Sequence, residues 1–189
     1  MAGGDFLPLF DRQLKFNLVS RFDYFLAKAL SPNDVLAPTK FVQAALYKRW
    51  KGYAPPGSCT LIPLKGSSFE NNPHECAYIA LCPTMRVPES VTWNREIVYN
   101  IVWSILVSLE QHNAAVDELT EIAAGVRIRK VLMTGLATGV GGVSGQRSAQ
   151  QMALAIKHFL DASRHPEKWS SLSWDHAALL AEEVRRTRT

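Results

Sequence analysis

Apolar residues recur at helical spacing in several stretches of the chain. Residues 91–111 carry the clearest stripe, formed by Val98, Ile101, Val102, Ile105, Leu106 and Leu109. The same spacing predicts helices over residues 11–30, 39–51, 114–124, 144–160 and 174–186. In the helix expected at 144–160, the side chains predicted to face inward are Ala149, Met152, Ala153, Ile156, Phe159 and Leu160.

Short apolar runs at residues 59–64, 77–82 and 129–134 lie between these helices and predict strands. The run at 77–82 is uninterrupted, which is typical of a strand buried on both faces. Alternating helices and strands predict an α/β protein with a parallel or mixed sheet. A length of 189 residues favours one domain over 1–189, with a basic tail at about 185–189.

A glycine-rich loop, GLATGVGGVS, follows the predicted strand 129–134 and precedes a predicted helix. Glycines let backbone N–H groups approach a phosphate, and the helix dipole favours its negative charge. The loop lacks the Gly-Lys pair of a P-loop, and Ser144 stands where a dinucleotide fingerprint needs its third glycine. Ser144 is better explained as a helix N-cap than as a nucleophile. The alternative is that the loop is only a flexible connection.

Several segments carry a family resemblance. TGLATGVGGVSGQRSAQQMALAI resembles the second phosphate-binding loop and following helix of macro domains, above all of the divergent macro domain-like proteins. AYIALCPTMRVPES is similar to their central strand and the run after it, and residues 1–5 are similar to the end of their first ligand loop. The resemblance implies a three-layer α/β/α sandwich with a mixed sheet, and a cleft that binds ADP-ribose or a related nucleotide. The family's strand–helix–strand section ahead of the first loop has no counterpart in this sequence, which weakens the expectation of adenine recognition.

The resemblance also assigns residues to the ligand. Gly3 and Gly4 would lie beside the distal ribose, with Asp5 as a candidate general base. The diphosphate would be held by Gly135, Thr138, Gly139, Val140, Gly141, Gly142 and Val143. Arg86 follows the central run and can pair with a phosphate through its guanidinium, or with Glu89 in a structural pair. For Asp5 the alternative is a helix cap or a solvated acid.

The activity stays open at this stage. Some macro domains hydrolyse ADP-ribosyl bonds or ADP-ribose phosphates and others only bind, so an ADP-ribosylated protein is a second possible partner. The rival hypothesis is a non-catalytic protein-interaction module, a shortened relative that has lost nucleotide binding. No cofactor is expected.

The remaining chemistry points to an ordinary intracellular protein. Three cysteines without CxxC spacing suit a reducing compartment, the cytoplasm or the nucleus, and predict no metal site. No apolar run reaches the ~20 residues that span a bilayer. The net charge of +4 is concentrated in C-terminal arginines, which favours a solvated tail over nucleic-acid binding. The remaining candidates are expected to have no functional role. His74 and Glu75 are predicted to be an exposed pair, Cys82 a core residue, and Trp93, Tyr99 and Trp103 packing residues.

Overall fold

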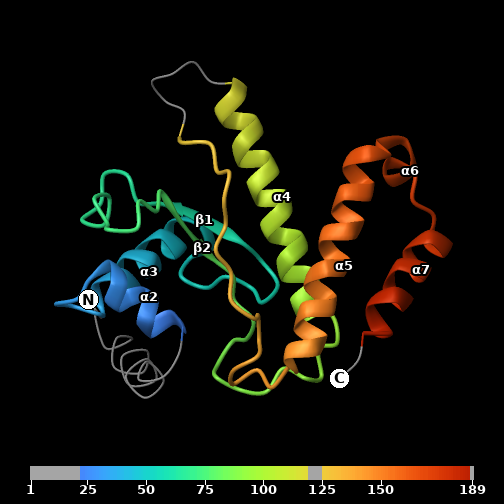
Figure 1. The fold of residues 1–189 in the computed structure, drawn as a ribbon, viewed down its shortest axis with the longest axis horizontal. Coiled ribbons are helices and arrows are strands. Elements are labelled where there is room, and N and C mark those ends of the chain that lie inside the picture. Colours follow the sequence, from blue (N-terminus) through green and yellow to red (C-terminus); the bar gives the residue numbers. More distant parts are fainter. Residues whose placement is uncertain (1–21, 119–124, 188–189) are drawn as a thin grey trace, which may run out of the picture. The chain divides into compact units, whose positions relative to one another are not determined.

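The computed structural model describes residues 22–118 and 125–187, and about half of these residues are helical (Figure 1). The helices are α2 (Phe22–Leu30), α3 (Ala37–Trp50), α4 (Ile97–Glu118), α5 (Gly145–Arg164), α6 (Pro166–Ser170) and α7 (Trp174–Arg185). The strands are β1 (Thr60–Pro63) and β2 (Tyr78–Leu81). None of the described helices is long and apolar enough to cross a membrane.

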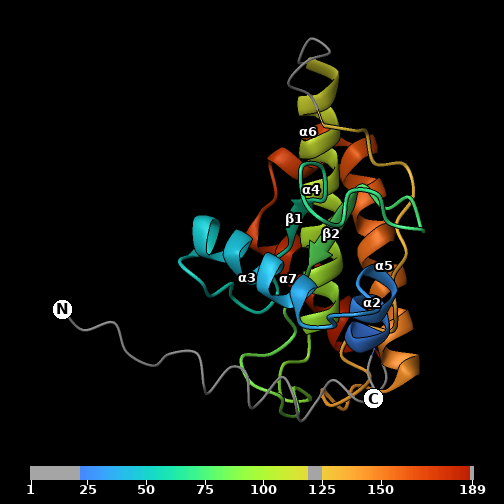
Figure 2. The same cartoon turned by 90° about the vertical axis from the view of Figure 1, so that its left-hand side faces the viewer.

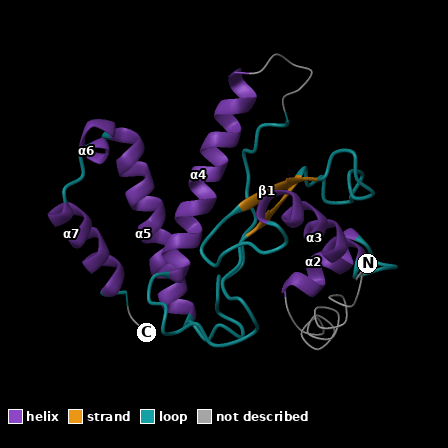
Figure 3. Ribbon diagram, turned by 180° about the vertical axis from the view of Figure 1, so that it is seen from behind, coloured by secondary structure: helices purple, strands orange, loops and turns teal. Residues whose placement is uncertain are grey.

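The three-layer α/β/α sandwich predicted from the sequence is wrong. The described residues contain one antiparallel two-stranded sheet, in which Thr60 pairs with Leu81 and Pro63 with Tyr78 (Figure 3). Strand β2 is mostly half-buried, not buried on both faces. A sheet of two short strands is too narrow to carry a layer of helices on each face.

The predicted strand at 129–134 is also wrong. This segment is extended, but its backbone forms no hydrogen bond with any other described residue. A strand is defined by its ladder of backbone hydrogen bonds, and in the sheet of the described residues β1 is paired with β2 and not with 129–134. Leu132 and Val131 are consequently 87% and 42% exposed, although their apolar character is that of a core strand.

The described residues divide into two compact units, one formed by residues 22–52 and 64–76 and the other by residues 53–63, 77–118 and 125–187. In the first unit, α2 contacts α3, and the Phe41 ring on α3 meets the Phe69 ring edge-on at 5.4 Å. Asn72 organises the loop at 64–76, because its amide donates to the carbonyls of Phe69 and Cys76 and its Oδ1 accepts from two backbone N–H groups. His74 and Glu75 are exposed on this loop, as expected.

In the second unit, α4 packs against α5, and the hairpin of β1 and β2 contacts α4 (Figures 1 and 2). The core combines hairpin, α4 and loop residues, namely Cys59, Val91, Ile97, Val98, Ile101, Ile105, Ala137 and Val143. The stripe predicted for residues 91–111 is therefore confirmed in its central part. The helix begins later, at Ile97, because residues 91–94 form a turn in which the Asn94 N–H donates to the Val91 carbonyl at 2.9 Å.

Helix α4 continues to Glu118, so the first part of the separate helix predicted at 114–124 is the end of α4. Residues 119–124 and the greater part of the helix predicted at 11–30 lie outside the described residues. Helix α6 was not predicted. It is tied to α5 by Asp161, whose carboxylate accepts from Lys168 Nζ at 2.7 Å and Trp169 Nε1 at 2.9 Å. These bonds hold the pKa of Asp161 well below its usual range.

The inward face predicted for α5 is right for Met152, which packs against the core cluster, and for Phe159, whose ring meets Trp103 edge-on at 5.6 Å, but it is wrong for the other four residues. The buried residues of this helix are Arg147, Ser148, Gln151, Ala155 and His158. Of the residues predicted to face inward, Ala149, Ala153, Ile156 and Leu160 are exposed and Met152 and Phe159 are half-buried. Helical spacing identified the apolar face of α5, but the face of α5 that α4 covers is a different and mainly polar one.

Candidate functional site

The glycine-rich loop turns back on itself before α5. The Val143 N–H donates to the Ala137 carbonyl at 3.1 Å, and the Gly142 N–H donates to the Gly139 carbonyl at 3.0 Å. Two residues take left-handed backbone conformations, Ala137 with φ of 59° and Gly142 with φ of 71°. These hydrogen bonds give residues 137–143 a defined shape and argue against a merely flexible connection.

Gly141 is required by close packing within the loop. A Cβ atom at this position would lie 2.5 Å from the Ala137 carbonyl oxygen, which real side chains do not tolerate. The Gly141 carbonyl also accepts from the Val91 N–H at 2.9 Å and so joins the loop to residues 84–94. Gly139 differs, because a Cβ there would meet no atom within 4 Å. Gly139 is therefore the position where the loop can be altered without disturbing its fold.

The loop leads directly into the N-terminus of α5. Ser144 is the N-cap, as predicted, and its Oγ accepts from the Arg147 N–H at 3.2 Å. The Ser148 hydroxyl donates to the Leu136 carbonyl at 3.0 Å and fastens the first turn of the helix to the loop. The positive end of the helix dipole therefore lies next to the exposed part of the loop.

The backbone N–H groups of the loop fall into two sets. Those of Gly142 and Val143 are used within the loop itself. Those of residues 138–141 have no acceptor among the described residues, and Thr138, Gly139 and Val140 are exposed. Four consecutive N–H groups without an acceptor in the described part of the chain, three of them on exposed residues, therefore precede the N-terminus of a helix, an arrangement suited to an anion.

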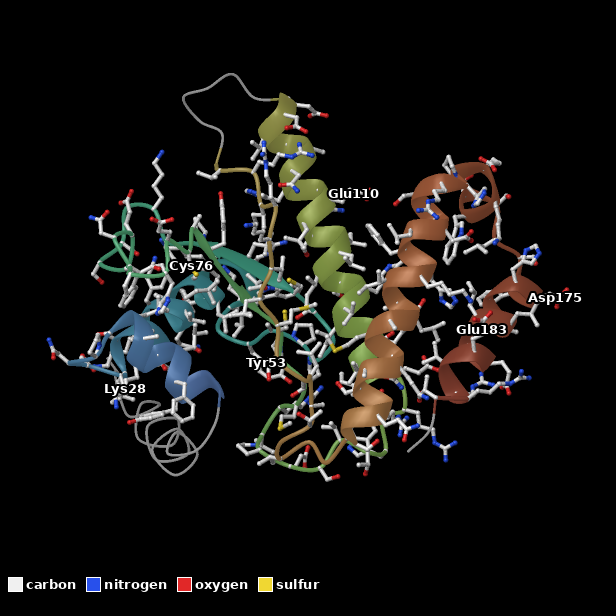
Figure 4. The ribbon with its side chains drawn as sticks, in the orientation of Figure 1. Lys28, Tyr53, Cys76, Glu110, Asp175 and Glu183 are labelled. Carbon is white, nitrogen blue, oxygen red and sulfur yellow. The ribbon has the colours of Figure 1, made fainter. Side chains whose placement is uncertain are left out.

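Arg86 lies on the segment that the loop contacts through Val91. Its guanidinium stands over the Tyr53 ring at 5.7 Å, and within the described chain it forms no ion pair with Glu89 (Tyr53 is labelled in Figure 4). Arg86, Glu89, Val91 and Trp93 help to line a small cavity of about 80 Å³. Ligand pockets typically have volumes of about 300–1,000 Å³. This cavity is thus too small for a nucleoside.

Arg147 was missed by the sequence analysis. It is only 6% exposed, and its Nη2 donates to the Arg95 carbonyl at 2.7 Å. No carboxylate among the described residues pairs with it, so a positive charge remains in the first turn of α5, where the helix dipole disfavours a cation. The signal in the sequence was its position three residues after the predicted N-cap.

The other predicted residues have different outcomes. Gly3, Gly4 and Asp5 lie outside the described residues. Cys82 packs against the core, as expected. Tyr99 and Trp103 are packing residues, also as expected, because their rings stack at 6.1 Å and Trp103 stacks on Trp169 at 5.6 Å. Trp93 is instead 74% exposed and does not pack in the core.

A separate cluster of polar side chains, away from the glycine-rich loop, joins α4, α5 and α7. The buried His158 ring contacts the Tyr99 hydroxyl through Nδ1 at 3.0 Å and Glu183 Oε2 through Nε2 at 3.3 Å. Burial and the nearby Glu183 raise the pKa of Tyr99 to about 12. Glu183 projects from α7 on the side of α5 and also accepts from Lys157 Nζ at 3.1 Å (Figure 4).

A groove of about 570 Å³ adjoins this cluster and is lined in part by Lys157, Glu183 and Arg186. Both cations are paired, Lys157 with Glu183 and Arg186 with Glu182. The groove therefore offers no uncompensated charge to an anion, which leaves the glycine-rich loop as the better anion site.

No protein-family model matches the chain, and no curated protein or solved structure is significantly similar to it. The assignment of a function therefore rests on the geometry of the loop and on the sequence pattern.

Proposed function

We propose that the loop from Gly135 to Ser144 binds the diphosphate of ADP-ribose or of a related nucleotide. The observation that carries the proposal is the row of N–H groups at residues 138–141, which have no acceptor among the described residues and which lead into the N-terminus of α5. N–H groups and a helix dipole together favour a phosphate group. Arg147 adds a positive charge in the same turn, and Arg86 lies on the neighbouring segment.

The proposal concerns the diphosphate more than the nucleoside. The cavity beside Arg86 cannot enclose adenine, so the ligand would lie on the exposed face of the loop. Binding of this kind is expected to depend on phosphate charge and to distinguish ADP-ribose and ADP from AMP. Hydrolysis of an ADP-ribosyl or phosphate ester bond, with Asp5 as general base, stays a prediction that depends on binding.

The test is a thermal-shift titration with ADP-ribose, ADP, AMP and inorganic pyrophosphate. A ligand that binds only the folded state raises the unfolding midpoint as its concentration passes the dissociation constant. The midpoint is expected to rise with ADP-ribose, ADP and pyrophosphate and to rise less with AMP. Equal responses to all four, or none, would contradict a diphosphate site.

The variant Gly139→Glu sharpens this test. Because Gly139 has open space around it and no left-handed φ, the new side chain fits without distorting the loop. Its carboxylate places negative charge beside the unpaired N–H groups, so ligand-induced stabilisation should be lost while the midpoint without ligand is kept. Ala178→Glu adds the same side chain at an exposed position of α7 and serves as the matched control. Full affinity in Gly139→Glu would reject the loop as the binding site.

A second candidate function is a protein-interaction module, favoured by the uncovered apolar surface. Ile156 and Leu160 are 38% and 46% exposed on α5, on the same face as Ala149 and Ala153. The extended segment 129–134 has no backbone hydrogen bond to any other described residue, and Leu132 on it is 87% exposed. Exposed extended backbone is a template for pairing with another chain. Self-association is the simplest form of such an interaction.

Sedimentation velocity over a range of protein concentrations tests this second function. Self-association that weakens in Leu132→Lys would support it, because a charge on the segment opposes pairing with a second copy. The control Val126→Lys introduces the same charge at a position also exposed, 63%, but outside 129–134. A monomer at every concentration would reject self-association.

A further inference from the structure

Two cysteines lie opposite each other at one end of the hairpin. Thr60 pairs with Leu81 in the ladder, and Cys59 immediately precedes Thr60 while Cys82 immediately follows Leu81. The Gly57 N–H donates to the Pro83 carbonyl at 3.0 Å, so the two segments of the hairpin remain hydrogen-bonded beyond the cysteines. The pair is therefore held between paired backbone on both sides.

The thiol groups of this pair interact directly. A hydrogen bond with Cys59 is the main cause that raises the pKa of Cys82, and burial of Cys82 raises it further. Cys59 is 6% exposed and Cys82 is half-buried. Facing residues of an antiparallel pair have Cα atoms about 4.5–5.5 Å apart, which falls within the range of about 4.4–6.8 Å that disulfides span.

We propose that Cys59 and Cys82 form a reversible disulfide that joins the start of β1 to the end of β2. The two thiols together lose two electrons and two protons. A low-molecular-weight disulfide such as oxidised glutathione accepts them and leaves as two thiols. The thiolate of the more exposed Cys82 attacks a glutathione sulfur and releases one glutathione, and Cys59 then attacks the mixed disulfide and releases the second.

The surroundings predict how this reaction behaves. Cys59 lies in the core cluster and Cys82 packs against it. Because the hydrogen bond with Cys59 and burial raise the pKa of the attacking Cys82, the reaction should be slow near neutral pH and faster as pH rises. The product constrains the unfolded chain and should raise the unfolding midpoint. The proposal is independent of any ligand, although Ala137 and Val143 of the glycine-rich loop belong to the same cluster.

The third cysteine makes the test discriminating. Cys76 is exposed and is nearer to Cys82 in sequence than Cys59 is. In an unfolded chain, closure of the shorter loop is favoured, so Cys76–Cys82 should prevail over Cys59–Cys82. In the folded protein the hairpin geometry should reverse this preference.

The experiment treats the full chain with oxidised glutathione, once folded and once in guanidinium chloride, and maps disulfides by non-reducing peptide mass spectrometry. The folded protein should yield Cys59–Cys82, with Cys76 carrying glutathione, and dithiothreitol should restore all three thiols. The unfolded protein should yield mainly Cys76–Cys82. A folded protein that gives Cys76–Cys82, or glutathione on Cys59 and Cys82 separately, or no pair at any pH up to 9, would overturn the proposal.

The Cys76→Ser variant isolates the pair. Oxidation of this variant should lower its intact mass by two hydrogen atoms and raise its unfolding midpoint, and reduction should reverse both changes. Adding Cys59→Ala should abolish the disulfide and leave one glutathione on Cys82. If that double variant does not fold, Cys76→Ser with Cys82→Ala provides the same comparison at the half-buried position. An unchanged mass in folded, oxidised Cys76→Ser would reject the disulfide.

Discussion

Helices α4 and α5 lie side by side but are held in the fold by different chemistry (Figures 1 and 2). Helix α4 buries Ile97, Val98, Ile101, Val102 and Ile105. Helix α5 buries mainly polar residues and leaves Ile156 and Leu160 exposed. The difference shows that the face a helix buries is decided by its neighbours, and that the more apolar face is not always covered.

Hydrogen bonds make the polar contact of α5 possible. Gln151 is 1% exposed, its Oε1 accepts from the Tyr99 N–H at 3.2 Å, and its Nε2 donates to Thr187 Oγ1 at 3.1 Å and to the Arg95 carbonyl. Buried polar atoms cost little when each has a partner, and among the described residues no fully buried side-chain nitrogen or oxygen lacks one. The contact between α4 and α5 therefore depends on defined hydrogen bonds, whereas the contact between α4 and the hairpin is formed by apolar side chains.

The largest expected effect comes from the apolar side of this comparison. Ile101 on α4 is completely buried, so Ile101→Ala should lower the free energy of unfolding by about 2–5 kcal/mol through lost burial and a cavity. Ile156→Ala on α5 makes the same chemical change on an exposed face and is the control. Denaturant unfolding followed by circular dichroism measures both. Equal losses in the two variants would mean that α5 buries its apolar face after all.

The next effect comes from the polar side. Gln151→Ala leaves the part-buried Tyr99 N–H without its side-chain acceptor, while the Arg95 carbonyl keeps its hydrogen bond from Arg147. The loss should be about 1–3 kcal/mol. Gln111→Ala removes an exposed amide from α4 and should cost far less. The same denaturant experiment applies. A loss no greater than in Gln111→Ala would show that the hydrogen bonds of Gln151 do not fix α5 against α4.

The same contrast explains what could be predicted from the sequence. The stripe of Ile101 and Ile105 was found because the apolar face of α4 is the buried one. Gln151 and His158 could not be assigned to the interior, since their burial depends on partners from α4 and α7 that periodicity does not reveal. The segment 129–134 has the composition of a core strand, but composition does not supply a ladder partner. The glycine-rich loop and its Ser144 cap were predictable because backbone conformation and capping are local.

The third effect is confined to acid pH. The hydrogen bond from Lys157, together with that from His158, holds the pKa of Glu183 below its usual value. A lowered folded-state pKa adds stability that is present above the unfolded pKa and is lost as pH falls through the folded one. The unfolding midpoint should therefore fall more steeply below about pH 4.5 in the natural sequence than in Glu183→Gln. Because Glu183 is 45% exposed, the difference should be small. Parallel pH profiles would show that Glu183 does not help to hold α7 on α5.

The smallest expected effect tests whether the apolar face of α5 is truly uncovered. Ile156 is 38% exposed, so Ile156→Ser should change the free energy of unfolding by no more than about 0.5 kcal/mol, as for other surface substitutions. The measurement is made at several protein concentrations, because only association with a second copy makes the stability depend on concentration. If a second copy covers this face, the natural sequence gains stability as concentration rises and the variant does not. A small loss that is the same at low and high concentration means that α5 presents an uncovered apolar stripe. A loss that grows with concentration means that the comparison between α4 and α5 holds only for the isolated chain.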